Sequence, residues 1–106
     1  MHPPDLDKPS LRGLNLVLRH RELWPVGFEW DYRSCPNCAM GLAQRLWKEI
    51  EFPVESYIAK AFGMSAASAQ KIFYYADISR KILRKNVTPE MIADDIEAYL
   101  RTGDAD

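Results

Sequence analysis

The sequence is poor in the residues that most enzymes and metal proteins use. It has two cysteines, Cys35 and Cys38, and two histidines among 106 residues. Two cysteines are too few for a disulfide framework, and no serine, histidine and acid stand in an arrangement typical of a nucleophilic site. The sequence also lacks a glycine-rich phosphate loop. We therefore predict a protein that is not an enzyme and that uses no cofactor.

Long apolar runs and a large excess of one charge are missing as well. No stretch approaches the roughly 20 apolar residues of a membrane span, and the prolines and charges of residues 1–10 argue against a secretory signal. Hydrophobic residues make up 47% of the chain, and the net charge is −1. This composition is that of an ordinary globular protein. We expect a cytoplasmic protein without a membrane partner, with a flexible tail over residues 1–9, one helical domain over 10–103 and a tail over 104–106.

Apolar residues recur at helical spacing over most of the chain. This pattern predicts an all-α fold, a compact orthogonal bundle of five or six short helices. The expected helix starts are marked by Ser10, Pro36, Pro53, Ser65, Asp77 and Thr88-Pro89. The expected ends lie at Trp24-Pro25, Gly63, Asn86 and Gly103. For the second and third helices, the predicted inward residues are Ala39, Leu42, Ala43, Leu46 and Ile50, then Val54, Tyr57, Ile58, Ala61 and Phe62.

Residues 27–33 depart from this helical period. Phe28, Trp30 and Tyr32 alternate with charged residues, as in a strand with one buried face. Because no second strand is evident, the segment is either an extended loop packed on helices or a strand that pairs with another chain, for example in a homodimer. Together with Trp24, these aromatic side chains either cover the core or anchor a protein partner.

Charge is distributed unevenly near the C-terminal end. Arg80, Lys81, Arg84 and Lys85 fall within residues 78–85, which contain no acid, whereas residues 86–106 contain six acids. On a helix, Arg80 would face Arg84 and Lys81 would face Lys85. The cluster is either a solvated helix face or a site for an acidic protein surface or a nucleic acid.

Residues 55–74 have features of a helix-turn-helix. Ala59 and Gly63 are four residues apart, Ile72 follows nine residues after the glycine, and Gly63-Met64-Ser65 is a plausible turn. In such a unit the second helix reads DNA with its exposed polar side chains. The candidates for this alternative are Ser65, Ser68, Gln70 and Lys71.

Cys35-Pro36-Asn37-Cys38 is a candidate thiol or metal site. A helix N-terminus stabilises a thiolate, but the βαβ unit of thioredoxin-like enzymes is not evident. A zinc site needs about two further ligands, for which His2 and His20 are the available histidines. The simpler interpretation is that Cys38 packs in the core while Cys35 lies in the preceding turn.

Several short motifs follow one another between Phe28 and Gly103. They are Cys38-Ala39-Met40-Gly41, Gly63-Met64-Ser65, the pair Ala69 and Phe73, and Thr88-Pro89-Glu90. Their order resembles that in a loose set of small helical proteins from bacteria and their phages. The spacing from Cys35 to Cys38 is narrower than in that set. The resemblance implies a compact helical fold and an origin in mobile elements.

These observations give three functional hypotheses. The first is a non-enzymatic protein–protein interaction module, with Trp24, Phe28, Trp30, Tyr32 and the four basic residues as contacts. The resemblance suggests that such a module is a phage inhibitor of a host defence system. The second is a DNA-binding regulator that uses residues 55–74. The third is thiol or metal chemistry at the cysteine pair.

Overall fold

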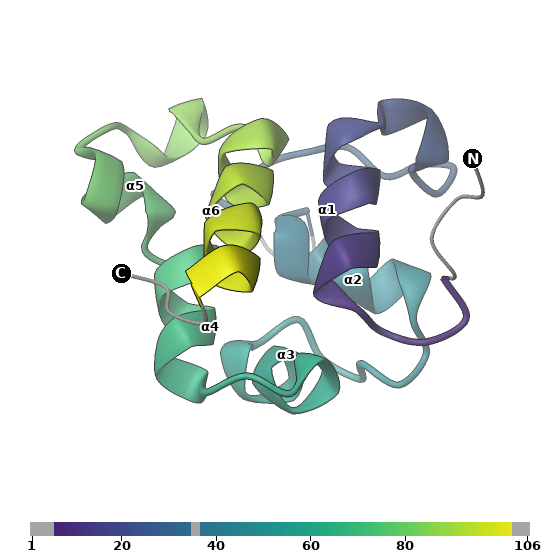
Figure 1. The fold of residues 1–106 in the computed structure, drawn as a ribbon. Helices are drawn as coiled ribbons and strands as arrows, with labels where there is room; N and C mark the ends of the chain where they lie inside the picture. Colours follow the sequence, from purple (N-terminus) through teal and green to yellow (C-terminus); the bar gives the residue numbers. More distant parts are fainter. Residues whose placement is uncertain (1–5, 35–36, 103–106) are drawn as a thin grey trace.

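Helices account for all the regular structure in the described residues, which are 6–34 and 37–102 of this computed structural model (Figure 1). This confirms the predicted all-α fold. A radius of gyration of 12.5 Å is that of a compact domain of this length. The elements are α1 (Leu11–Arg19), the 3₁₀ helix η1 (Arg21–Leu23), α2 (Ala39–Leu46), α3 (Glu55–Phe62), α4 (Ala66–Phe73), α5 (Ala76–Arg80), the 3₁₀ helix η2 (Arg84–Asn86) and α6 (Pro89–Thr102).

Three of the predicted helix starts are confirmed by side-chain caps. Ser10, Ser65 and Thr88 each accept a hydrogen bond from the backbone N–H three residues later, at 2.9, 3.1 and 3.3 Å. Such a bond satisfies one of the N–H groups that have no partner inside the helix. The boundaries of α1, α4 and α6 are therefore set by local sequence.

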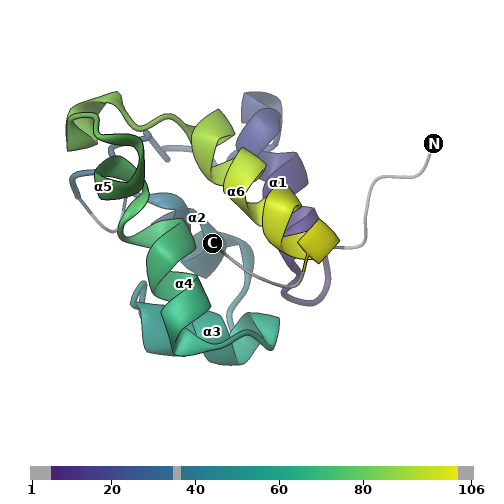
Figure 2. The same cartoon turned by 60° about the vertical axis from the view of Figure 1, so that its left-hand side comes forward.

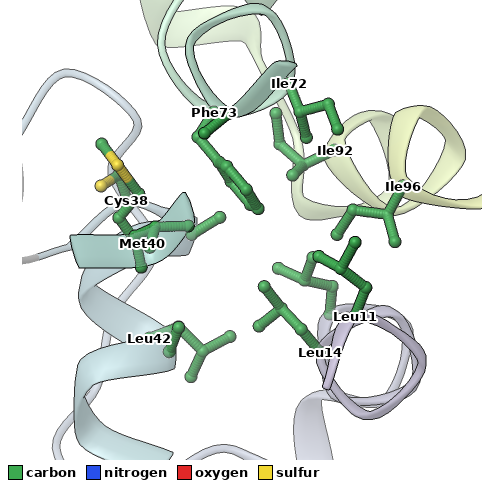
Figure 3. Packing of buried hydrophobic residues seen from close by; sticks show 14 of the residues in the cluster. Leu11, Leu14, Cys38, Met40, Leu42, Ile72, Phe73, Ile92 and Ile96 are labelled. Atoms are coloured by element: carbon green, nitrogen blue, oxygen red, sulfur yellow. The ribbon is translucent and has the colours of Figure 1, made fainter. Parts of the chain in front are cut away.

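The core is centred on α1 and α6, which lie side by side although they are the first and last helices (Figures 1 and 2). Leu14 of α1 and Ile96 of α6 are fully buried. In Figure 3, side chains from α1, α2, α4 and α6 point toward one another, with Phe73 between the α2 and α6 sides. The apolar stripes of short helices thus combine into one core.

The second and third helices differ from the prediction at their ends. α2 begins at Ala39 and ends at Leu46, so Ile50 reaches the core from the segment after the helix. Pro36 lies outside the described residues. Val54 precedes α3, and Tyr57 is 39% exposed because it packs against the Phe52 ring at the surface. The prediction that Val54 and Tyr57 point inward is therefore wrong.

The fifth helix is shorter than predicted. α5 ends at Arg80, and Lys81 adopts a left-handed conformation with φ of 57°. The backbone N–H groups of Lys81 and Ile82 close the helix by donating to the carbonyls of Ile78 and Asp77. Asp77 lies in the first turn and is not the cap. Because the chain turns at Lys81, the predicted i, i+4 pairs of basic residues do not lie on one helix face.

Residues 27–33 form a loop that packs on the helices, which is one of the two structures expected for them. The backbone N–H groups of Phe28 and Asp31 donate to the carbonyls of Pro25 and Asn37. Among the described residues this segment pairs with no strand of its own chain. Pairing with a second chain in a homodimer stays a prediction.

The described part of the N-terminal segment is held in place. Leu6 packs against the core, and its carbonyl accepts a hydrogen bond of 2.8 Å from Trp47 Nε1. Residues 1–5 and 104–106 of the predicted tails, and the expected stop at Gly103, lie outside the described residues. Among the helices that the structure describes, none has the length and apolar character of a membrane span.

Candidate nucleic-acid interface

α3 and α4 form a tight helical pair joined by residues 63–65. Gly63 ends α3 with φ of 68°, a conformation in which a side chain is unfavourable. The N–H of Met64 then bonds to the carbonyl of Ala59 at 3.0 Å, and Ser65 starts α4 as its cap. Ala59 and Met64 are buried in this turn. The glycine, the small residue and the cap predicted from the sequence thus meet in one structural unit.

The inner face of α4 belongs to the core, and its outer face is accessible. Ala69, Ile72 and Phe73 are buried. Figure 2 shows α4 on the near side of the molecule, with the fainter α1 and α2 further back. On the outer face, Ala66, Ala67, Lys71 and Tyr74 are exposed, and Ser68 and Gln70 are half-buried. A helix with this exposure can be placed against a groove without rearranging the core.

The four predicted contact residues differ in their exposure and in the hydrogen bonds that they make. Lys71 is exposed on α4. Ser65 and Ser68 are engaged with each other, because the Ser65 hydroxyl donates to Ser68 Oγ at 3.0 Å and also caps the helix. Gln70 Nε2 donates to Glu55 Oε1 at 3.4 Å, which ties α4 to the start of α3. The hydroxyls of Ser65 and Ser68 thus stabilise the start of α4, and the Gln70 amide joins α4 to α3.

Sequence analysis missed two residues of this surface. Tyr74 follows Gln70 by four residues, and Glu55 begins α3 next to Gln70. Helical spacing from Gln70 is the signal that identifies Tyr74. Glu55 has no such signal, because its position depends on how α3 packs against α4.

Comparison with known proteins adds no homologue from which to infer the role of this surface. No family model, curated protein or solved structure matches the chain.

The four residues of the predicted basic cluster differ in the contacts that they make within the protein. Arg80 makes a two-pronged ion pair with Asp95, at 2.7 and 2.8 Å, and also donates to the Met91 carbonyl. The hydrogen bond to Asp95 raises the pKa of Arg80 above its usual value. Lys81 and Lys85 are exposed. Arg80 is therefore a structural contact between α5 and α6, Arg84 is half-buried and pairs with Asp77, and Lys81 and Lys85 are the exposed cations of the cluster.

The predicted aromatic contacts lie largely inside the fold. Phe28 and Tyr32 are buried, and Trp24 and Trp30 are half-buried. Both indole N–H groups are used internally, by the carbonyls of Val17 and Val87 at 2.8 Å. Phe28 and Tyr32 thus close the side of the helical core, and a partner contact by the half-buried Trp24 and Trp30 stays a prediction.

No metal site is found at Cys38 among the residues that the structure describes. Cys38 is buried at the N-cap of α2 and carries no free thiol. Cys35 lies outside the described residues. No group of three or more potential metal ligands occurs in the part of the chain that the structure describes.

Proposed function

We propose that this protein binds double-stranded DNA through α3 and α4, with α4 in the major groove. The observation that supports this most directly is the turn at Gly63, which holds the capped helix α4 against the core with Ala66, Ala67 and Lys71 exposed on its outer face. The major groove of B-form DNA is wide enough to accept an α-helix. In helix-turn-helix proteins the second helix enters the groove and the first crosses the backbone.

The outer face of α4 has the chemistry that base contacts require. A glutamine amide can pair with adenine, a lysine with guanine, and small methyl-bearing residues with the thymine methyl group. Gln70, Lys71 and the exposed Ala66 and Ala67 supply these groups along one helix. The combination favours recognition of a mixed sequence rather than of phosphates alone.

Local charge supports DNA binding although the whole chain carries a net charge of −1. Residues 71–85 contain five basic residues and a single acid, Asp77. Of the acids of α6, Asp94 and Glu97 contact Arg19, whereas Asp95 neutralises Arg80, so the other four basic residues outnumber Asp77 at this surface. The field at a binding surface depends on the charges nearest to it, so this surface can attract a polyanion.

A binding titration with matched variants tests this proposal. Fluorescence anisotropy with a pool of labelled duplexes should show binding at low salt that weakens as salt increases. Lys71→Ala should reduce the affinity by about tenfold, as expected for a direct base contact. Lys8→Ala removes the same charge from the segment before α1, away from α4 in Figure 1, and should leave binding unchanged.

Two results would contradict the proposal. One is the absence of binding to any duplex at low salt by the unaltered protein. The other is an equal loss of affinity in the Lys71 and Lys8 variants, which would indicate a charge effect without an α4 site.

Removing the charge of Glu55 should strengthen DNA binding, in contrast to the loss expected for Lys71→Ala. Its carboxylate lies beside Gln70 and would face the DNA phosphates with the same charge. Glu55→Gln removes that repulsion, so the variant should bind duplex several-fold more tightly at low salt, with a smaller gain at high salt. An unchanged affinity would place Glu55 and Gln70 away from the nucleic acid.

A protein partner is the second candidate, because large apolar side chains are exposed beside α4. Tyr74, Tyr75, Ile78 and Leu83 are 42%, 39%, 65% and 62% exposed. Exposed apolar patches of this kind often mark protein interfaces, and inhibition of a host system would be one use of such an interface. Leu83→Ser should abolish capture of a protein partner from host lysate while leaving duplex affinity unchanged, and capture that resists salt would favour this candidate.

A further inference from the structure

Arg84 is held in a fixed orientation next to the C-terminal end of α4. Its guanidinium carbon lies 4.8 Å from the ring centre of Tyr32 and 5.2 Å from that of Tyr74. Contacts of this type between a cation and a ring face are attractive and restrict the side chain. The 27–33 loop and α4 therefore position one guanidinium between two aromatic rings.

Some of the N–H donors of Arg84 are not used by the hydrogen bonds that hold its side chain. Its Nη1 donates to the Tyr74 carbonyl at 3.3 Å and to Asp77 Oδ1 at 3.4 Å. Within the described part of the chain, Nε and Nη2 have no acceptor. These two groups form the planar fork that matches two oxygens of a phosphate or carboxylate.

The open fork borders a pocket of about 390 Å³. The pocket is lined by Tyr32, Arg33, Met40, Phe73, Tyr74 and Arg84. Arg33 is paired with Asp31, and Arg84 is close to Asp77, so each acid balances one arginine. The exposed Lys81 and Lys85 nearby in the chain give this region its excess of positive charge.

We propose that Arg84 binds a phosphate of the DNA backbone next to the groove occupied by α4. The inference rests on the DNA-binding function proposed above and adds a defined contact to it. Arg84 follows the second helix of the pair, and Tyr74 is both the residue after α4 and a wall of its pocket. A phosphate contact at this point fixes the orientation of α4 on the duplex without selecting a base.

The salt dependence of binding measures this contact. Arg84→Gln should weaken binding to every duplex by a similar factor and lower the slope of log affinity against log salt by about one. Gln70→Ala should instead change which duplexes are preferred. Arg12→Gln is the matched control, because Arg12 is exposed on α1, and this variant should keep both the affinity and the slope.

Two further measurements test whether the effect of Arg84→Gln comes from the loss of the contact and whether the bound phosphate belongs to DNA. The first uses Arg84→Lys, and the second is spectroscopic. Lysine keeps the charge without the fork, so the slope should be retained while part of the affinity is lost. In the unaltered protein, the NMR signal of the Arg84 Nε–H group should shift on adding duplex. It should shift less with inorganic phosphate at matched ionic strength, because free phosphate lacks the α4 contacts.

The outcomes separate the two proposals. Failure of the unaltered protein to bind any duplex overturns both. Binding that depends on Lys71 but keeps its full salt slope in Arg84→Gln overturns only the Arg84 contact. An Nε–H signal unchanged by duplex also overturns it, whether or not the Arg84→Gln variant folds.

Discussion

Tyr32 should make the stability of this protein sensitive to alkaline pH. Its side chain is 2% exposed, and its hydroxyl accepts a hydrogen bond of 3.2 Å from the backbone N–H of Ala76. Burial raises the pKa of Tyr32 to about 12, although the Ala76 bond and the Arg84 charge act in the opposite direction. The folded protein thus keeps this phenol neutral at a pH where the unfolded chain ionises it.

The size and direction of the effect follow from this difference. The ordinary tyrosine pKa is about 10, and each pH unit between the two values costs about 1.4 kcal/mol. The stabilising contribution is complete below about pH 10 and is lost as the pH rises toward about 12. The ionisation of Tyr32 alone should therefore remove about 3 kcal/mol of unfolding free energy over this range.

Tyr32→Phe isolates the contribution from those of the other ionisable groups. At neutral pH the variant should be less stable by about 1–3 kcal/mol, because the buried Ala76 N–H loses its acceptor. Since phenylalanine does not ionise, the two proteins should approach equal stability near pH 12. Urea unfolding followed by circular dichroism at neutral pH and at about pH 10 and 12 gives the comparison. A stability difference that stays constant over this range would refute the argument that burial controls the ionisation of Tyr32.

Two further changes test contacts that shape the site. Gly63→Ala has open space for its methyl group but forces a side chain into a left-handed backbone, so it should cost about 1 kcal/mol and lower the melting temperature by roughly 4–8 °C. Gly63→Asn should cost less, and an unchanged melting temperature for the alanine variant would contradict the role given to this glycine. Arg80→Gln and Asp95→Asn should each destabilise the protein by about 1–2 kcal/mol, as expected for a charge-assisted contact of low exposure. A double-mutant cycle should give a coupling energy clearly above zero, whereas strictly additive losses would indicate that the ion pair contributes nothing.

Local signals predicted the parts of the fold that local interactions determine. Ser10, Ser65 and Thr88 cap helices because a hydroxyl reaches an N–H only three residues away. Gly63 ends α3 because few residues tolerate its backbone conformation. The pair of helices α3 and α4 combines two of these signals, so the pair could be predicted from the sequence.

Distant contacts determine the parts that were predicted incorrectly. The basic residues after Ser79 look like one helix face in the sequence, but Arg80 is drawn to Asp95, fifteen residues away, and the chain turns at Lys81. Tyr57 has the spacing of an inward residue, yet Phe52 holds it at the surface. The orientation of Arg84 depends on Tyr32, which no local pattern connects to it.

The pairing of α1 with α6 has a consequence for synthesis of the chain. α1 leaves the ribosome long before α6, so its apolar face has to wait for its main partner. The α3–α4 unit, by contrast, depends on neighbours in sequence and can form early, because closing a short loop costs little entropy. A chain released before α6 would expose Leu14, Val17 and Leu18, and we expect such fragments to be substrates for chaperones and proteases.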